Sequence, residues 1–143
     1  MGNISNYLES KILDHVFRQI EYKPPEACFL GLVSDRASEQ DLEEGSLEHE
    51  IDGYQGDRKE VKFNPPAQEE GKGTVKSVAS ARFVQMPPGA VRYGIVCDSI
   101  APGTGNILYW LYIKDGQGNI VTREAVEGDT LEVPAEQITL KLD

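Results

Sequence analysis

Residues 107–113 read Ile-Leu-Tyr-Trp-Leu-Tyr-Ile, and this stretch decides the fold of the chain. Successive side chains of a β-strand point to opposite sides, so a strand built from these residues is apolar on both faces. A strand of an antiparallel sheet normally presents one of its faces to water. The stretch therefore predicts a central strand that is covered on both sides, or a strand whose outer face meets another subunit.

The residues after this strand predict a hairpin and a β-rich C-terminal part. Residues 114–119 read Lys-Asp-Gly-Gln-Gly-Asn, and their two glycines can adopt the positive φ that a tight turn requires. A return strand is expected to begin at 120–122. Apolar and polar residues alternate at 131–133 and again at 138–142, which is typical of half-buried strands.

The residues before the central strand predict three further strands, at 59–63, 74–84 and 90–97. Turn residues separate the predicted strands at intervals of about ten residues, as in all-β proteins. The sequence therefore predicts a mainly β fold, an antiparallel β-sandwich with a jelly-roll-like arrangement. A closed β-barrel is the alternative.

An amphipathic helix is predicted at residues 6–20, before the first strand. Asn6 can cap its first turn, and Glu9, three residues later, can complete a capping box. A helix of this length is marginal alone in water, so its apolar stripe is expected to pack on the body of the protein or on a partner. The double proline Pro24-Pro25 stops the helix before a short apolar strand at 27–33. The stripe consists of residues spaced by three and four: Leu8, Ile12, Leu13, Val16, Phe17 and Ile20.

Residues 34–58 form a strongly acidic segment with nine acidic and two basic residues. Charge runs of this kind are usually solvated, so the segment predicts a long surface loop. An acidic docking surface is one alternative. An ordered calcium site is another, because carboxylate oxygens are ligands that calcium prefers, although the residue order of an EF-hand is missing.

The composition is typical of one folded domain. The chain has 143 residues, 39% of them hydrophobic and 27% charged, which fits a single core. The formal net charge of −10 opposes binding to nucleic-acid phosphates, and no apolar run is long enough to cross a membrane. We therefore expect one domain over 1–143, with the helix at 6–20, the acidic loop at 34–58 and a main β body at 59–143, and no direct contact with nucleic acid or membrane.

The residue types that carry chemistry do not form a recognisable site. His15 lies beside the apolar stripe of the helix, and His49 lies between two glutamates of the acidic segment. Cys28 and Cys97 occur in apolar runs, which is typical of buried free cysteines. The chain has no nucleophile elbow, phosphate loop or paired-histidine motif. The sequence therefore predicts a protein that is not an enzyme, with no catalytic, cofactor-binding or metal-binding residue.

Short motifs in both halves of the chain resemble a family of small tailed-phage virion proteins. The resemblance covers most of the chain except the acidic segment, where the family has a shorter run rich in Gly, Ser and Thr. The motifs are Asn6-Tyr7-Leu8-Glu9, Leu13-Asp14-His15, Tyr22-x-Pro24-Pro25, Leu30-Gly31-Leu32, Ala81-x-Phe83, Val91-x-Tyr93-Gly94-Ile95-Val96, Gly105-Asn106-Ile107-Leu108-Tyr109-Trp110, Gly128-Asp129-Thr130-Leu131 and Ile138-Thr139-Leu140-x-Leu142.

This resemblance implies a structural protein of the virion, without catalysis. Members are often labelled tail-fibre-like, and related small β proteins serve as capsid decoration or cement proteins. We expect a capsid decoration protein, made in the host cytoplasm and placed on the capsid exterior, which as a homotrimer binds the major capsid protein and stabilises the mature head. The alternative is a tail-fibre or tail-adaptor component that binds a host glycan or another tail protein.

Six residues are expected at contacts between subunits, because aromatic residues are favoured at the centres of interfaces. The alternative for these residues is the core of the single chain. They are Tyr7, Leu8 and Phe17 on the helix and Tyr109, Trp110 and Tyr112 on the central strand.

Overall fold

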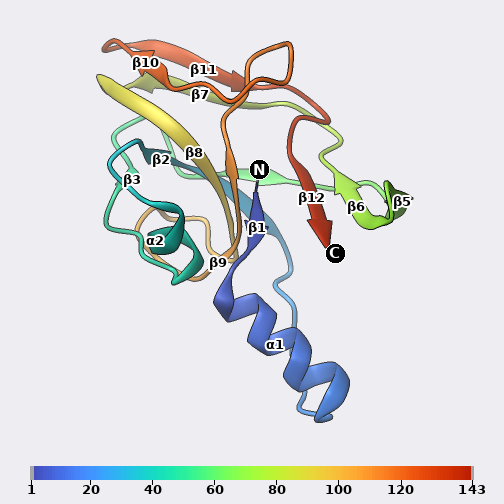
Figure 1. The fold of residues 1–143 in the computed structure, drawn as a ribbon. Coiled ribbons are helices and arrows are strands. Elements are labelled where there is room, and N and C mark those ends of the chain that lie inside the picture. The colour runs from blue at the N-terminus through green and yellow to red at the C-terminus, as the bar shows by residue number, and fades with distance from the viewer. Residues whose placement is uncertain (1, 143) are drawn as a thin grey trace.

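The computed structural model describes residues 2–142, and a seven-stranded sheet forms one layer of its fold (Figure 1). Every pairing in this sheet is antiparallel. The main path runs β1-β9-β8-β2-β3, while β4 also pairs with β2 and β10 with β8. The strands are β1 (Asn3–Ile4), β2 (Cys28–Ser34), β3 (Glu50–Ile51), β4 (Lys59–Val61), β8 (Gly89–Cys97), β9 (Ile107–Tyr112) and β10 (Arg123–Ala125).

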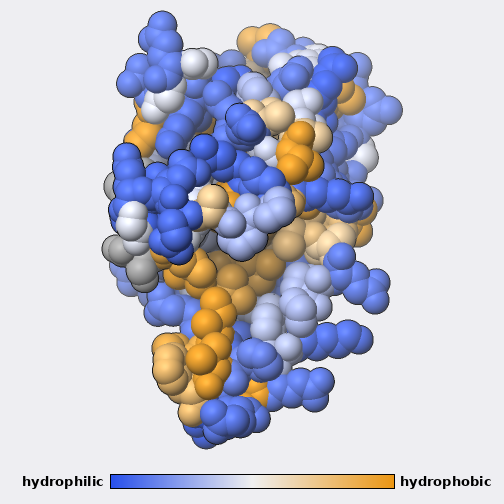
Figure 2. All heavy atoms as spheres, turned by 90° about the vertical axis from the view of Figure 1, so that its right-hand side faces the viewer, coloured by the Kyte–Doolittle hydropathy of each residue, from blue (hydrophilic) through white to orange (hydrophobic). Residues whose placement is uncertain are grey.

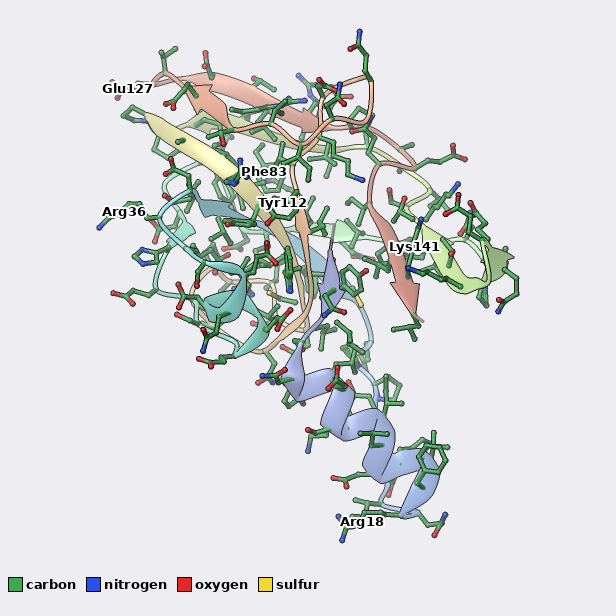
Figure 3. The ribbon with its side chains drawn as sticks, in the orientation of Figure 1. Arg18, Arg36, Phe83, Tyr112, Glu127 and Lys141 are labelled. Carbon is green, nitrogen blue, oxygen red and sulfur yellow. The ribbon has the colours of Figure 1, made fainter. Side chains whose placement is uncertain are left out.

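Two smaller antiparallel sheets form the second layer. One pairs β7 (Ala81–Met86) with β11 (Asp129–Val133), and the other has the order β12-β6-β5, from Thr139–Leu142, Lys72–Lys76 and Ala67–Glu69. A large apolar core lies between the layers, and Phe83, labelled in Figure 3, is fully buried in it. The predicted mainly β antiparallel fold is therefore confirmed. Among the described residues the sheets do not close, so the barrel alternative was wrong.

A second core covers the other face of the large sheet. It joins side chains of β2, β8 and β9 to Leu42, which is fully buried on the short helix α2 (Glu39–Glu43). Strand β9 lies between β1 and β8, and Tyr109 belongs to the first core while Trp110 belongs to the second. The predicted central strand is therefore covered on both sides by its own chain.

The segment 34–58, predicted as a long surface loop, is mostly irregular but includes two short elements and packs on the sheet. The segment contains α2 and β3, and Ser38 caps α2 in a reciprocal pair with Asp41. The Ser38 amide donates to the Asp41 carboxylate over 2.9 Å, and the Asp41 amide donates to the Ser38 hydroxyl over 3.1 Å. A few buried apolar side chains therefore hold an acidic segment against the sheet while most of its acidic residues are exposed.

A buried ion pair fixes the end of this segment to the sheet. Arg58 donates to the two carboxylate oxygens of Glu50 over 2.6 and 2.8 Å, and the two side chains are almost inaccessible to water. The guanidinium also donates to the carbonyls of Ser99 and Thr104. A Cβ at Gly31 would lie 2.7 Å from a Glu50 oxygen, so a glycine in β2 leaves the space that the pair occupies.

The N-terminal helix α1 (Asn6–Phe17) begins at the predicted residue but has a different cap and a different end. Its N-cap is Ser5, whose hydroxyl accepts from the Leu8 amide, and not Asn6. The helix ends three residues before the predicted Ile20, because Gln19 adopts a positive φ and the Ile20 amide donates back to the Asp14 carbonyl. The prolines at 24 and 25 therefore lie in the connection to β2 and do not end the helix.

The predicted strand 74–84 is two strands, β6 and β7, in different sheets. The chain leaves β6 at Ser77, which is buried and accepts from the amides of Glu136 and Ile138 through its hydroxyl. Hydrogen bonds from residues near the C-terminus therefore interrupt a stretch whose sequence pattern predicts one continuous strand. Strand β5 lies between the predicted strands at 59–63 and 74–84, where no strand was predicted.

Candidate interaction surface

Helix α1 carries the largest exposed apolar side chains of the fold. It projects from one end of the β body, and none of its residues is buried (Figure 1). The exposed fraction is 52% for Leu13, 54% for Val16 and 73% for Phe17, and Ile20 just after the helix is 44% exposed. We call these four residues the α1 stripe. Figure 2 shows apolar side chains gathered on the lower, projecting part of the molecule. The expected packing of this face on the body is therefore not found.

A groove of about 680 Å³ lies beside the stripe, where α1 meets the body. It is bounded by β1 and β12, the first and last strands, and by α1 and α2. Ile12 and Leu13 of α1 and Leu142 of β12 give it apolar surface, so the groove and the α1 stripe form one continuous face. Figure 2 shows apolar atoms continuing from the helix into the hollow where it joins the body.

The two sides of the groove carry opposite charges. The acidic side is supplied by the two helices, and the basic side is supplied by β6, β12 and the turn after β9. Lys141, labelled in Figure 3, marks the basic side on β12. The acidic residues are Glu9, Glu39 and Glu43, and the basic residues are Lys72, Lys114 and Lys141.

Tyr109 fixes β12 against β9 next to the groove. Its hydroxyl accepts from the Lys141 amide over 3.2 Å and lies 3.4 Å from the Lys141 carbonyl. Burial raises the pKa of this tyrosine above its ordinary value. The neutral Tyr109 hydroxyl contacts both the amide and the carbonyl of Lys141. These contacts hold β12, which carries Lys141, against β9.

Tyr112 joins α2 to the central strand. Its hydroxyl donates to the Glu39 carboxylate, and its ring lies 5.4 Å from that of Trp110 in an edge-on arrangement. Burial and then the Glu39 carboxylate raise the pKa of Tyr112 to about 12, because both disfavour a second negative charge. The guanidinium of Arg92 lies over the Tyr112 ring, 5.2 Å from the centre of that ring.

The six residues predicted at subunit contacts fall into two groups. Tyr7 and Leu8 are half-buried at the base of α1, and Phe17 is exposed near its end. On β9, Tyr112 is half-buried, but Tyr109 and Trp110 are only 5% and 2% exposed, in the cores of their own chain. Their roles between subunits stay predictions, and the exposed helix residues are the better placed to meet a partner.

The sequence analysis missed the charged sides of the groove. Residues 9, 43, 72, 114 and 141 lie far apart along the chain and converge only through the strand order. No local pattern could have grouped them. The one available signal was the apolar stripe, which marked α1 as a contact surface.

The residue types that commonly bind metals do not cluster in the part of the chain that the structure describes. Between residues 2 and 142 no group of three or more His, Cys, Asp or Glu side chains could hold a metal ion. His15 is exposed, and its Nδ1 lies 3.2 Å from the Ile20 carbonyl. Within the same residues, no helix is long and apolar enough to span a membrane.

An open β-sandwich that exposes an apolar helix beside a charged groove has a surface of the kind that binds other molecules. A comparison with protein families gives the particular family. The family model described as Podophage GP4 fiber I protein gp80 matches residues 3–141, and the chain belongs to this family. The protein is therefore a structural component of a bacteriophage virion, and the predicted resemblance to such proteins is confirmed. No curated protein matches the chain.

Proposed function

We propose that the protein is a fibre component of a podophage virion that acts by binding and carries no catalytic activity. The observation that carries this proposal is the α1 stripe beside the groove, an apolar contact face on a helix that projects from a rigid β body. The description of the matching family, a podophage fibre protein, supports the same role.

The fold fits a passive part of a larger assembly. The body is held by two cores and a buried ion pair, so it keeps its shape while α1 is free to contact a neighbour. Several modest contacts made at once by linked copies hold far more strongly than one contact alone. Such a protein acts in the virion through where it is placed and through the many contacts that its copies make at once.

A second candidate is the capsid decoration protein that the sequence analysis placed first. In that role a homotrimer would bind the major capsid protein on the capsid exterior and stabilise the mature head by mass action. The net charge of −10 favours this candidate, because a strongly acidic protein is repelled by packaged DNA and suits the outer surface.

Electron microscopy of purified virions labelled with a gold-conjugated antibody against the chain tests the two candidates. The fibre proposal expects label at the tail or at fibres, with few particles of gold per virion. Label spread over the whole head would overturn the fibre proposal in favour of decoration. Absence of label from intact virions, with denatured virions as the control for epitope access, would overturn both.

A further inference from the structure

We propose that the bond between Asp52 and Gly53, just after β3, is a site of covalent self-modification, at which the folded chain converts Asp52 to isoaspartate. The bond between Asp115 and Gly116 has the same sequence, and its surroundings protect it. This inference concerns the covalent ageing of the chain, so it goes beyond the proposed function and does not depend on it.

The reaction needs only the chain and water. The Gly53 amide nitrogen attacks the carbon of the protonated Asp52 side-chain carboxyl group. The carboxyl OH leaves with the amide proton as water, and a succinimide ring closes. Water then adds to one of the two ring carbonyls. Addition at the former backbone carbonyl breaks its bond to the nitrogen, so the main chain continues through the side-chain carbon as isoaspartate.

Glycine after the aspartate makes a bond of this kind reactive. Glycine has no side chain to shield its nitrogen, and its backbone adopts more conformations than that of other residues. The sequence contains two Asp–Gly bonds and no Asn–Gly bond. Local structure therefore decides which of the two bonds reacts.

The surroundings of Asp52 leave both reacting groups free. Asp52 and Gly53 are exposed and lie between β3 and the buried Tyr54. A Cβ placed on Gly53 would have its nearest neighbours, two carbons of Pro87, at 3.8 Å, so no distant part of the chain crowds the bond. Among residues 2–142 no hydrogen bond holds the Asp52 carboxylate or the Gly53 amide. The nitrogen and the carboxyl carbon are therefore free to meet.

The surroundings of Asp115 hold its carboxylate in place. One carboxylate oxygen accepts from the Gln117 amide over 2.8 Å and from the Asn119 amide over 2.9 Å. The Asp115 amide also donates to the Asn119 carbonyl, which fixes the backbone of the turn. The amides of Asn119 and Gln117 hold the pKa of the Asp115 carboxyl below its ordinary value. The carboxyl is therefore turned away from its own peptide bond and has less of the reactive protonated form.

The position of Asp52 gives the modification a structural consequence. Isoaspartate adds one carbon to the main chain and places the carboxylate on a different carbon. On one side of the bond Glu50 pairs with the buried Arg58. On the other side the Tyr54 ring lies edge-on to Phe83, with 5.0 Å between the ring centres. The extra atom therefore falls in the short connection between the buried ion pair and the first core.

Peptide mapping of the aged chain tests the inference. The full chain is kept folded at neutral pH for several weeks, and mass spectrometry with electron-transfer fragmentation then locates and quantifies isoaspartate. We expect isoaspartate at residue 52 to accumulate about tenfold faster than at residue 115, because two hydrogen bonds must open before Asp115 reacts. In guanidinium chloride neither aspartate is held, so the two rates should become similar.

Two matched variants give an independent readout, methylation of the aged chain by an isoaspartate-specific methyltransferase. Asp52→Glu should remove most of the methyl incorporation, because the larger ring that glutamate would form closes far more slowly. Asp115→Glu should leave the incorporation unchanged. Circular dichroism checks that both variants are folded.

Three results would overturn the inference: a folded chain that forms no isoaspartate at residue 52, equal rates at residues 52 and 115 in the folded chain, or a preference for residue 52 that persists in the unfolded chain. These measurements use the isolated chain. Their failure is therefore distinct from a failure to find the protein on the tail.

Discussion

Glu50 and Arg58 form the one ion pair among the described residues whose two side chains are both buried. Removing one partner of a buried pair leaves the other charge without compensation, which costs about 3–5 kcal/mol. Glu50→Gln should therefore lower the free energy of unfolding by an amount in this range. Glu48→Gln, two residues earlier and exposed, should change it by less than about 0.5 kcal/mol. Urea unfolding of both variants measures the difference, and equal values would contradict the role of the pair.

Cys97 provides a prediction that depends on pH. Burial raises the pKa of its thiol from 9.0 to about 12, and the thiolate is the reactive form, so iodoacetamide should label this residue at pH 8 only when the protein unfolds. The unfolded chain ionises near pH 9 while the folded chain stays protonated. This thiol therefore stabilises the fold fully below pH 9 and loses its contribution as pH rises towards about 12. Mass spectrometry of labelled peptides checks the reactivity, and rapid labelling of the folded protein would refute the assignment.

Trp110 packs in the second core, so its substitution should affect folding of the single chain. Trp110→Ala should lower the free energy of unfolding by about 3–5 kcal/mol. Trp110→Phe should cost less, because it keeps an aromatic ring and removes a buried indole N–H that has no hydrogen-bond partner. Thermal melting of the two variants tests this order, which a larger loss for Phe than for Ala would reverse.

Among the elements, α1 differs most from the strands in its exposure. Few packed side chains and exposed hydrogen bonds allow local opening, so α1 amides should exchange with solvent much faster than those of β9 in dilute protein. Hydrogen exchange followed by mass spectrometry measures the difference. Exchange in α1 as slow as in β9 would contradict this prediction.

The elements with strong local patterns were predictable from the sequence. The apolar run at 107–113 predicted a central strand, and β9 is buried on both sides because its composition allows no other position. The spacing of Leu13, Val16 and Phe17 predicted a helix and its apolar stripe. These features depend only on residues close together in the chain.

The elements that failed depend on distant residues. The segment 34–58 carries nine acidic residues, but Leu42 packs on the sheet and Glu50 pairs with Arg58, and both contacts need the folded sheet. The break at Ser77 depends in the same way on amides of the C-terminal part. Charge density alone therefore indicated a loop where tertiary contacts stabilise a helix and a strand.

The candidate surface belongs to the molecule as a whole. Its apolar part was visible in the sequence as a helical stripe, whereas its charged sides come from β6, β12, α1, α2 and the turn after β9. Only the order of strands brings these elements around one groove. The overall charge of −10 does not reveal this grouping, because the groove collects acidic and basic residues together.

The family identifies a structural component of a virion, and we propose that it works through contacts made by its apolar helix and groove. Quantitative mass spectrometry of virions purified away from free protein tests this description most directly. We predict that the chain copurifies with infectious particles in a fixed number of copies, and that virions from a phage carrying Phe17→Glu contain far fewer. Virions that lack the chain altogether, or that retain it unchanged with Phe17→Glu, would contradict the account.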